Sequence, residues 1–195
     1  MTTSRSLPAL SAIAGAVLRS KDGTEVLAKT LWENGPVAVL VLRRPGCVLC
    51  RDEAQRLWER RAAFERLGVK LVCVVHEWIQ REVDAFSPGF WPGPLYHDPS
   101  KSFYGALNGG TPLRGSLMPL LNPFGSVWKR IRSAASRVKE HNVIGDGLIM
   151  GGAMVVRQGD GGVAWTHLEA EIGLIAEPEE VLAAAKAVAA ETAST

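Results

Sequence analysis

Residues 36–50 read PVAVLVL-RRPG-CVLC: an apolar run, a short basic loop, and two cysteines separated by two residues. The run Pro36–Leu42 has the length and the β-branched content of a buried strand. From Arg51 to Leu67, apolar residues recur at spacings of three and four, which predicts a helix. The cysteine pair therefore falls at the junction of a strand and a helix. The first turn of a helix has unpaired backbone N–H groups that stabilise a thiolate, so this position predicts a redox-active dithiol.

The run Val69–Val75 has strand length too, and it completes a strand–helix–strand unit. Two strands joined in this way are expected to be parallel neighbours. Further elements are predicted on both sides of the unit. They are an N-terminal hairpin over Ala14–Leu27, a helical turn at Lys29–Glu33, helices at Glu77–Phe86, Lys101–Leu107, Ser126–Lys139 and Pro178–Ala190, a short strand at Leu95–Tyr96, and a terminal hairpin of Leu148–Val156 and Val163–Leu168.

This order of elements predicts an α/β thioredoxin-like fold, a central mixed sheet flanked by helices. The hairpin is an N-terminal extension of that fold, and residues of about 108–140 form an inserted helical segment. The chain of 195 residues is long enough for one core and shows no linker, so we predict a single domain over 1–195.

The composition indicates which partners and which cellular compartment to expect for this protein. The net charge of +2 is too small to favour nucleic acid or an anionic membrane as the main partner. We therefore expect no nucleic-acid partner and no membrane contact. The basic helix Ser126–Lys139 is expected to lie on the sheet with its charges in solvent, and contact with a membrane surface or a partner is the alternative. Three cysteines do not suggest a disulfide-stabilised secreted protein, so we expect a cytoplasmic location.

The positions of the two cysteines predict a different chemical role for each. Cys47, at the helix start, is expected to be the attacking thiolate, and Arg43 and Arg44 are expected to stabilise it. Cys50, one helical turn later, would resolve the adduct as a disulfide. Two alternatives are thiols that never oxidise and a metal site completed by Cys73 and His76. Because residues three apart in a strand point to opposite faces, that second pair would not converge, and we predict no metal site.

The dithiol segment, residues 43–54 (RRPGCVLCRDEA), resembles the active-site segment of the peroxiredoxin-like 2 family, of the AhpC/TSA type. The resemblance continues through residues 67–69, 74–77 and 103–105. It returns at residues 145–152 (GDGLIMGG) and 167–171. It thus runs from about the first hairpin to the last helix.

The resemblance implies a thioredoxin-like fold and antioxidant thiol chemistry, with Cys47 attacking and Cys50 resolving. One branch of the family, prostamide/prostaglandin F synthase, reduces a lipid endoperoxide through its CxxC motif. The family implies no tightly bound cofactor. Electrons would come from NADPH through a separate thiol reductase, with a thioredoxin-type reductant as the partner. True peroxiredoxins have Thr or Ser at the position of Arg44 and Pro at that of Leu40, so the hydroxyl that orients peroxide is missing here.

Two functions fit the sequence. The first is a thiol-dependent oxidoreductase that reduces a peroxide or lipid endoperoxide and turns over many times. The second is a redox-regulated sensor or binding protein that oxidises once and changes a partner contact.

Overall fold

The structure of the chain is a computed structural model that describes residues 6–193. Residues 1–5 and 194–195, which belong to the domain predicted over 1–195, lie outside the described residues. In chain order the elements are α1 (Ser11–Ala14), β1 (Val17–Ser20), β2 (Glu25–Leu27), the 3₁₀ turn η1 (Ala28–Leu31), β3 (Val37–Leu42), α2 (Val48–Glu59), α3 (Arg61–Arg66), β4 (Lys70–Val75), α4 (Gln80–Phe86), β5 (Leu95–His97), α5 (Ser102–Leu107), the 3₁₀ turn η2 (Met118–Leu121), α6 (Ser126–Arg137), β6 (Gly152–Val156), β7 (Val163–Leu168) and α7 (Pro178–Ala193).

The seven strands of residues 6–193 form one mixed sheet in the order β2-β1-β5-β4-β3-β6-β7. Strand β3 pairs in parallel with β4 and antiparallel with β6, so it lies inside the sheet with a partner on each side. The predicted parallel pair and both predicted hairpins are confirmed. The N-terminal hairpin joins the sheet through β1, which pairs antiparallel with β5.

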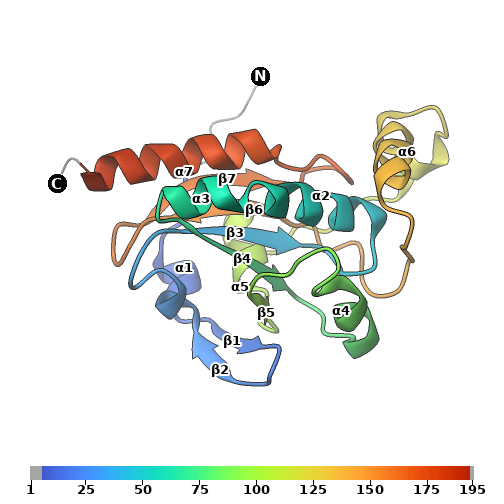
Figure 1. Cartoon of the computed structure of the whole chain (residues 1–195). Helices are drawn as coiled ribbons and strands as arrows, with labels where there is room; N and C mark the ends of the chain where they lie inside the picture. The colour runs from blue at the N-terminus through green and yellow to red at the C-terminus, as the bar shows by residue number, and fades with distance from the viewer. Residues whose placement is uncertain (1–5, 194–195) are drawn as a thin grey trace.

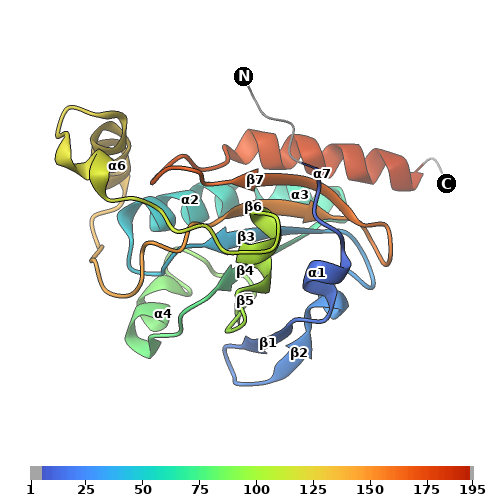
Figure 2. The same cartoon turned by 180° about the vertical axis from the view of Figure 1, so that it is seen from behind.

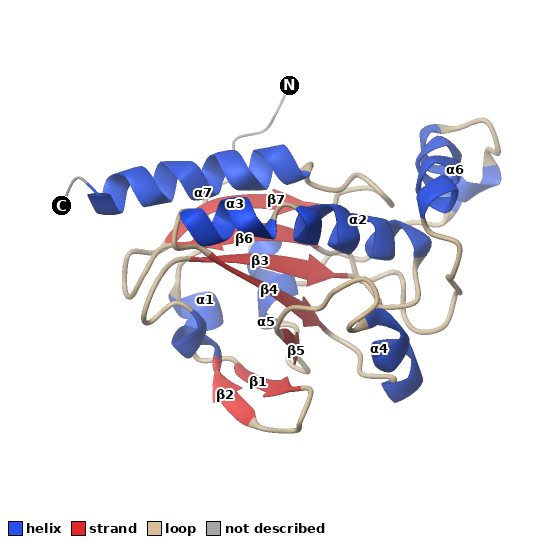
Figure 3. Ribbon diagram, in the orientation of Figure 1, coloured by secondary structure: helices blue, strands red, loops and turns tan. Residues whose placement is uncertain are grey.

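Helices cover both faces of the sheet. Figure 1 and Figure 3 show α2, α3 and α7 on one face, and Figure 2 shows α1 and α5 on the other. Alternate residues of β3 point into these two layers: Ala38, Leu40 and Leu42 pack into the first core, and Val37, Val39 and Val41 into the second. A strand buried on both faces has a continuous apolar sequence, which explains the run Pro36–Leu42.

Two predicted boundaries are wrong. The helix predicted over Arg51–Leu67 begins at Val48 and is two helices, because the chain turns at Arg60 between α2 and α3. No glycine or proline marks that turn in the sequence. The last hairpin was predicted from Leu148, but β6 begins only at Gly152, whose φ of 155° suits glycine alone.

The inserted segment contains η2 and α6, and α6 confirms the helix predicted there. Helix α6 packs beside α2, and Val127 and Ala134 of α6, with Val138 directly after it, are buried in the same core as α2. Figure 1 and Figure 2 show α6 and the loop before it at the end of the molecule toward which β3 points. The insertion therefore lies beside the strand end that carries the dithiol, rather than over the sheet.

Gly151 stands where the chain passes closest to the end of β3. A Cβ at this position would lie 2.0 Å from the carbonyl oxygen of Val41, and neither backbone can give way easily. We expect Gly151→Ala to reduce the free energy of unfolding by about 2–4 kcal/mol. Thermal unfolding would measure it, with a fall in Tm of roughly 5–15 °C. Gly15→Ala is the matched control, because a Cβ there meets nothing within 4 Å. Equal Tm values for the two variants would contradict this account.

Candidate active site

The dithiol lies at the carboxyl end of β3, at the start of α2. Cys47 is the N-cap residue of α2, with extended backbone (φ −73°, ψ 134°), and its carbonyl accepts the Arg51 N–H at 2.9 Å. Cys50 lies in the first turn of α2. Both thiols are free and buried, so the structure shows the reduced form. The position predicted for Cys47 at the helix start is confirmed.

Arg43 connects Cys47 to two distant parts of the chain. Its Nη2 donates to Cys47 Sγ at 3.4 Å, and its Nη1 donates to the Gly147 carbonyl at 3.0 Å. Its Nε lies 2.9 Å from Glu169 Oε2, and both side chains of this ion pair are buried. A buried guanidinium that is held in place from three sides provides a fixed positive charge beside the sulfur.

The pKa values of the two thiols are shifted in opposite directions. The pKa of Cys47 is held well below its usual value, first by the hydrogen bond from the Cys50 thiol and then by the positive charge of Arg43. The pKa of Cys50 is raised well above its usual value, because its proton is held by Cys47 and because the group is buried. These shifts favour a thiolate at Cys47 and a protonated thiol at Cys50.

Arg44 has a different position from Arg43. Its Nη1 donates to the carbonyls of Val143 and Gly145, at 2.5 and 3.1 Å. The guanidinium thus holds the loop that follows α6 against the dithiol loop. Its charge also lowers the pKa of Cys47, but it ranks behind that of Arg43. Of the two arginines, only Arg43 contacts the sulfur in the structure.

Two buried carboxyl groups near the dithiol were missed by the sequence reasoning. Glu53 lies on α2 one turn beyond Cys50, and Glu169 follows β7. Burial raises the pKa of both groups, most strongly for Glu53, where the neighbouring Glu169 adds to the rise. The signal for Glu53 was its spacing of three residues from Cys50, which puts both on one side of the helix.

A pocket of about 640 Å³ opens beside Cys47. The dithiol loop forms one wall, and the loop of residues 141–148 forms a second. The third wall is apolar and comes from the insertion, with Leu117, Leu120, Trp128 and Ile131. The Trp128 indole N–H donates to the Leu120 carbonyl at 2.8 Å and holds this wall together. The pocket thus joins the Cys47 thiol to an apolar surface.

The other candidate ligands lie apart from this site. Cys73 is fully buried inside β4, where burial raises its pKa. His76 packs edge-on against Tyr104, with ring centroids 5.1 Å apart. Within residues 6–193, no three His, Cys, Asp or Glu side chains are arranged to hold a metal ion.

The fold and the paired thiols define a thioredoxin-fold protein of the peroxiredoxin-like class. Solved structures support the predicted fold. Peroxiredoxin Q of Xanthomonas campestris superposes with a TM-score of 0.63 at 15% identity, covering 94% of this chain and 97% of that one. The mitochondrial 2-Cys peroxiredoxin of Plasmodium falciparum gives a TM-score of 0.55 at 13% identity and covers 92% of both chains.

Sequence comparison identifies the family. The model of the AhpC/TSA antioxidant enzyme family matches residues 56–171. Peroxiredoxin-like 2A of Xenopus tropicalis is 38% identical over 161 residues, which is 83% of this chain and 68% of that protein. Human peroxiredoxin-like 2A is 36% identical over 172 residues, or 88% and 72% of the two chains. The chain belongs to the AhpC/TSA antioxidant enzyme family, and the predicted family resemblance is confirmed.

None of the helices in the described residues is both long enough and apolar enough to cross a bilayer.

Proposed function

We propose that this protein is a thiol-dependent reductase of peroxides or lipid endoperoxides, working through a Cys47–Cys50 disulfide. The observation that carries the proposal is the hydrogen bond from Arg43 to Cys47 Sγ, beside a Cys50 thiol that keeps its proton. In this arrangement the attacking group is ionised and the resolving group is not. The order of the two steps follows from that difference.

With a hydroperoxide, the Cys47 thiolate attacks one oxygen and the O–O bond breaks. The leaving alkoxide takes up a proton, and Cys47 becomes a sulfenic acid. Cys50 then loses its proton and attacks the Cys47 sulfur, which forms the disulfide and releases water. With an endoperoxide, the first product is a sulfenate ester, and Cys50 displaces the second alcohol. Either way, two electrons pass from the thiols to the O–O bond.

The apolar wall of the pocket supports a substrate with an apolar body. Leu117, Leu120 and Ile131 offer a peroxide no hydrogen bonds, so they suit the hydrocarbon part of a lipid peroxide. Arg43 and Arg44 line the same pocket and suit an anionic group. These features favour a lipid peroxide or endoperoxide over hydrogen peroxide.

The cycle closes when a thioredoxin-type partner reduces the disulfide. We propose that its electrons come from NADPH through a separate thiol reductase, with no cofactor held by this chain. A cycle that depends on such reductants suits the cytoplasm. We also propose that the whole chain 1–195 acts as one domain.

The direct test is the mass of the intact protein before and after brief exposure to one equivalent of a peroxide, with the thiols mapped by peptide. We expect a loss of two hydrogens, located at Cys47 and Cys50, followed by repeated turnover with thioredoxin, thioredoxin reductase and NADPH. Oxidation without turnover would favour the redox sensor. Thiols that stay reduced with hydrogen peroxide, an alkyl hydroperoxide and a lipid endoperoxide would refute both.

Replacing Cys50 by serine is expected to stop the cycle after its first half. The serine cannot form a disulfide, so Cys47 stays as a sulfenic acid or as a mixed disulfide. Labelling with dimedone, which reacts with sulfenic acids, should mark Cys47 in this variant and not in the parent protein. Turnover should fall to background. A Cys50→Ser protein that turns over normally would show that another thiol resolves the adduct.

A further inference from the structure

The exposed apolar side chains of this protein gather around the mouth of the dithiol pocket. Nine large apolar side chains are exposed in the described part of the chain, and five of them lie within residues 117–143. These five are between 55 and 88% exposed, whereas the other four reach only 42–48%. We call the five the apolar rim; they are Leu117, Met118, Leu121, Phe124 and Val143. Leu117 and Val143 also line the pocket, so the rim and the pocket are continuous.

The same segment carries an uneven charge. Residues 108–139 contain six basic side chains and no acidic one. The net charge of the chain is +2, so the rest of the protein has a net charge of −4. Three of the six, Arg114, Arg130 and Arg137, are paired with carboxylates of other segments. Among the residues that the structure describes, no carboxylate lies within ion-pair distance of Lys129, Arg132 or Lys139.

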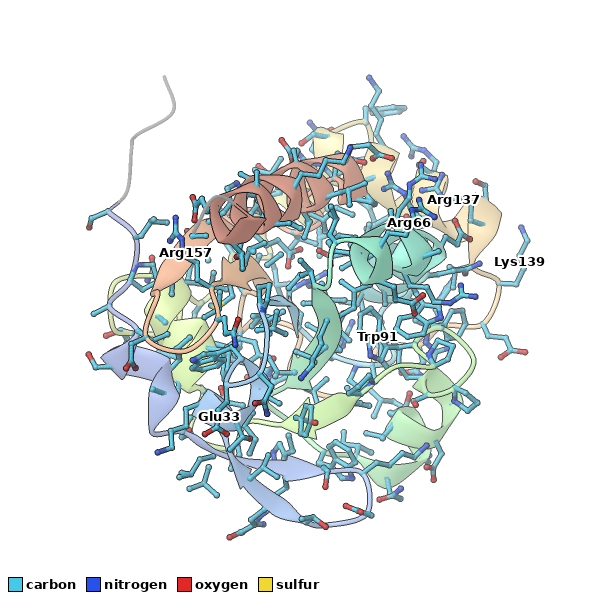
Figure 4. The ribbon with its side chains drawn as sticks, turned by 60° about the vertical axis from the view of Figure 1, so that its left-hand side comes forward. Glu33, Arg66, Trp91, Arg137, Lys139 and Arg157 are labelled. Atoms are coloured by element: carbon cyan, nitrogen blue, oxygen red, sulfur yellow. The ribbon has the colours of Figure 1, made fainter. Side chains whose placement is uncertain are left out.

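One of these cations lies next to the apolar rim. Arg132 Nη1 donates to the Pro123 carbonyl at 3.1 Å, which places the guanidinium next to Phe124. Lys139 follows the end of α6, and Figure 4 shows it at the outer edge of the molecule. Apolar side chains flanked by basic ones are the pattern of a segment that enters the interface of an anionic bilayer.

We propose that the apolar rim and its cations dock on the surface of an anionic lipid bilayer. Phe124, Leu121 and Met118 would enter the headgroup region, and Arg132 and Lys139 would contact lipid phosphates. From the sequence we expected the charges of the basic helix Ser126–Lys139 to lie in solvent, with contact with a membrane surface as the alternative. The exposed apolar rim beside this helix favours that alternative. Docking would place the pocket mouth against the lipid, so that an oxidised lipid reaches Cys47 directly. Only this last step rests on the proposed function.

A second copy of this chain is a less suitable partner. A symmetric dimer brings the same patch of both subunits together. Here it would place two clusters of unpaired cations face to face, and the insertion has only one acidic side chain, Glu140 at its end, to offset them. A surface of negatively charged phosphates has the complementary charge.

The test is co-sedimentation of the full chain with vesicles of phosphatidylcholine alone or with about one third phosphatidylserine. We expect binding to the anionic vesicles, weakening as salt rises from about 0.1 to 0.5 M. Leu121→Ser/Phe124→Ser should weaken that binding by ~10-fold or more, and Arg132→Glu/Lys139→Glu similarly. None of the four residues lines the pocket, so oxidation by hydrogen peroxide should stay at the parent rate.

Two control variants carry the same changes elsewhere on the surface. Leu27→Ser/Leu174→Ser removes exposed apolar side chains, and Lys29→Glu/Arg66→Glu reverses exposed charges. Both should bind vesicles like the parent protein. Cys47→Ser should bind equally well, which separates docking from the chemistry. Absence of vesicle binding, equal binding to neutral vesicles, or a dimer that Leu121→Ser/Phe124→Ser dissociates in sedimentation velocity would each overturn the proposal.

Discussion

Cys47→Ser is expected to abolish reduction of peroxide, with a fall in rate of ~10³-fold or more. A serine hydroxyl stays protonated at neutral pH and cannot form a disulfide, so neither half of the cycle proceeds. The rest of the site should persist, because Arg43 keeps its hydrogen bond to the Gly147 carbonyl and its ion pair with Glu169. The measurement is consumption of NADPH in a coupled assay with thioredoxin and its reductase, at saturating peroxide.

Cys73→Ser is the matched control for this variant. It removes the third thiol, which is fully buried in β4 and separate from the pocket. We expect this change to lower Tm while the rate per folded molecule stays at the parent value. Full turnover by Cys47→Ser would disprove the mechanism, and loss of turnover in Cys73→Ser at unchanged folding would show that the wrong thiol was assigned.

Arg43→Met is expected to have the second large effect, on both stability and reactivity. The change leaves the Glu169 carboxylate buried without its cation, which typically costs ~3–5 kcal/mol. It also removes the donor to Cys47 Sγ, so the pKa of Cys47 should rise toward the ordinary thiol value of about 8.5. Arg56→Met is a suitable control, because the Arg56–Glu177 pair is on the surface and is worth about 1 kcal/mol or less.

The double variant Arg43→Met/Glu169→Gln separates the two effects. Without the carboxylate there is no unpaired buried charge, so much of the lost stability should return, while the pKa of Cys47 should stay high. The rate of alkylation by iodoacetamide, measured against pH, reports the thiolate. In the parent protein this rate should fall only when pH drops through the lowered pKa. In both Arg43 variants the fall should begin at a higher pH than in the parent protein, nearer the ordinary thiol pKa of about 8.5. Identical pH profiles would show that Arg43 does not set the acidity of Cys47.

Much of the fold could be predicted from local patterns. The runs Pro36–Leu42 and Val69–Val75 are apolar throughout because helices cover both of their faces, and that signal is strong. The dithiol was placed correctly because a strand and a helix flank it in the sequence. The break at Arg60 was missed because it uses ordinary helical residues and no glycine or proline.

The site was harder to predict because much of it is assembled over long distances in the chain. Arg43 is 126 residues away in sequence from Glu169, its ionic partner, and no local pattern connects them. The pocket wall from Leu117 to Ile131 comes from an insertion whose place in the fold had no sequence signal. Arg43 and Arg44 were treated as equivalent, and only the three-dimensional structure separates the one that contacts sulfur from the one that holds a loop.

The Arg43–Glu169 pair has a consequence for how this protein can evolve. Replacing either residue alone lowers the stability of the folded protein, since the other residue is left as an unpaired charge in the interior. The two positions should therefore be inherited as a unit. Among relatives, a lineage that replaces the arginine should also have replaced the glutamate, with a neutral or apolar pair in their place. Such a lineage would retain the fold but lack the positive charge beside its first cysteine. We expect its members to have lost the thiol-dependent reduction of peroxides as well.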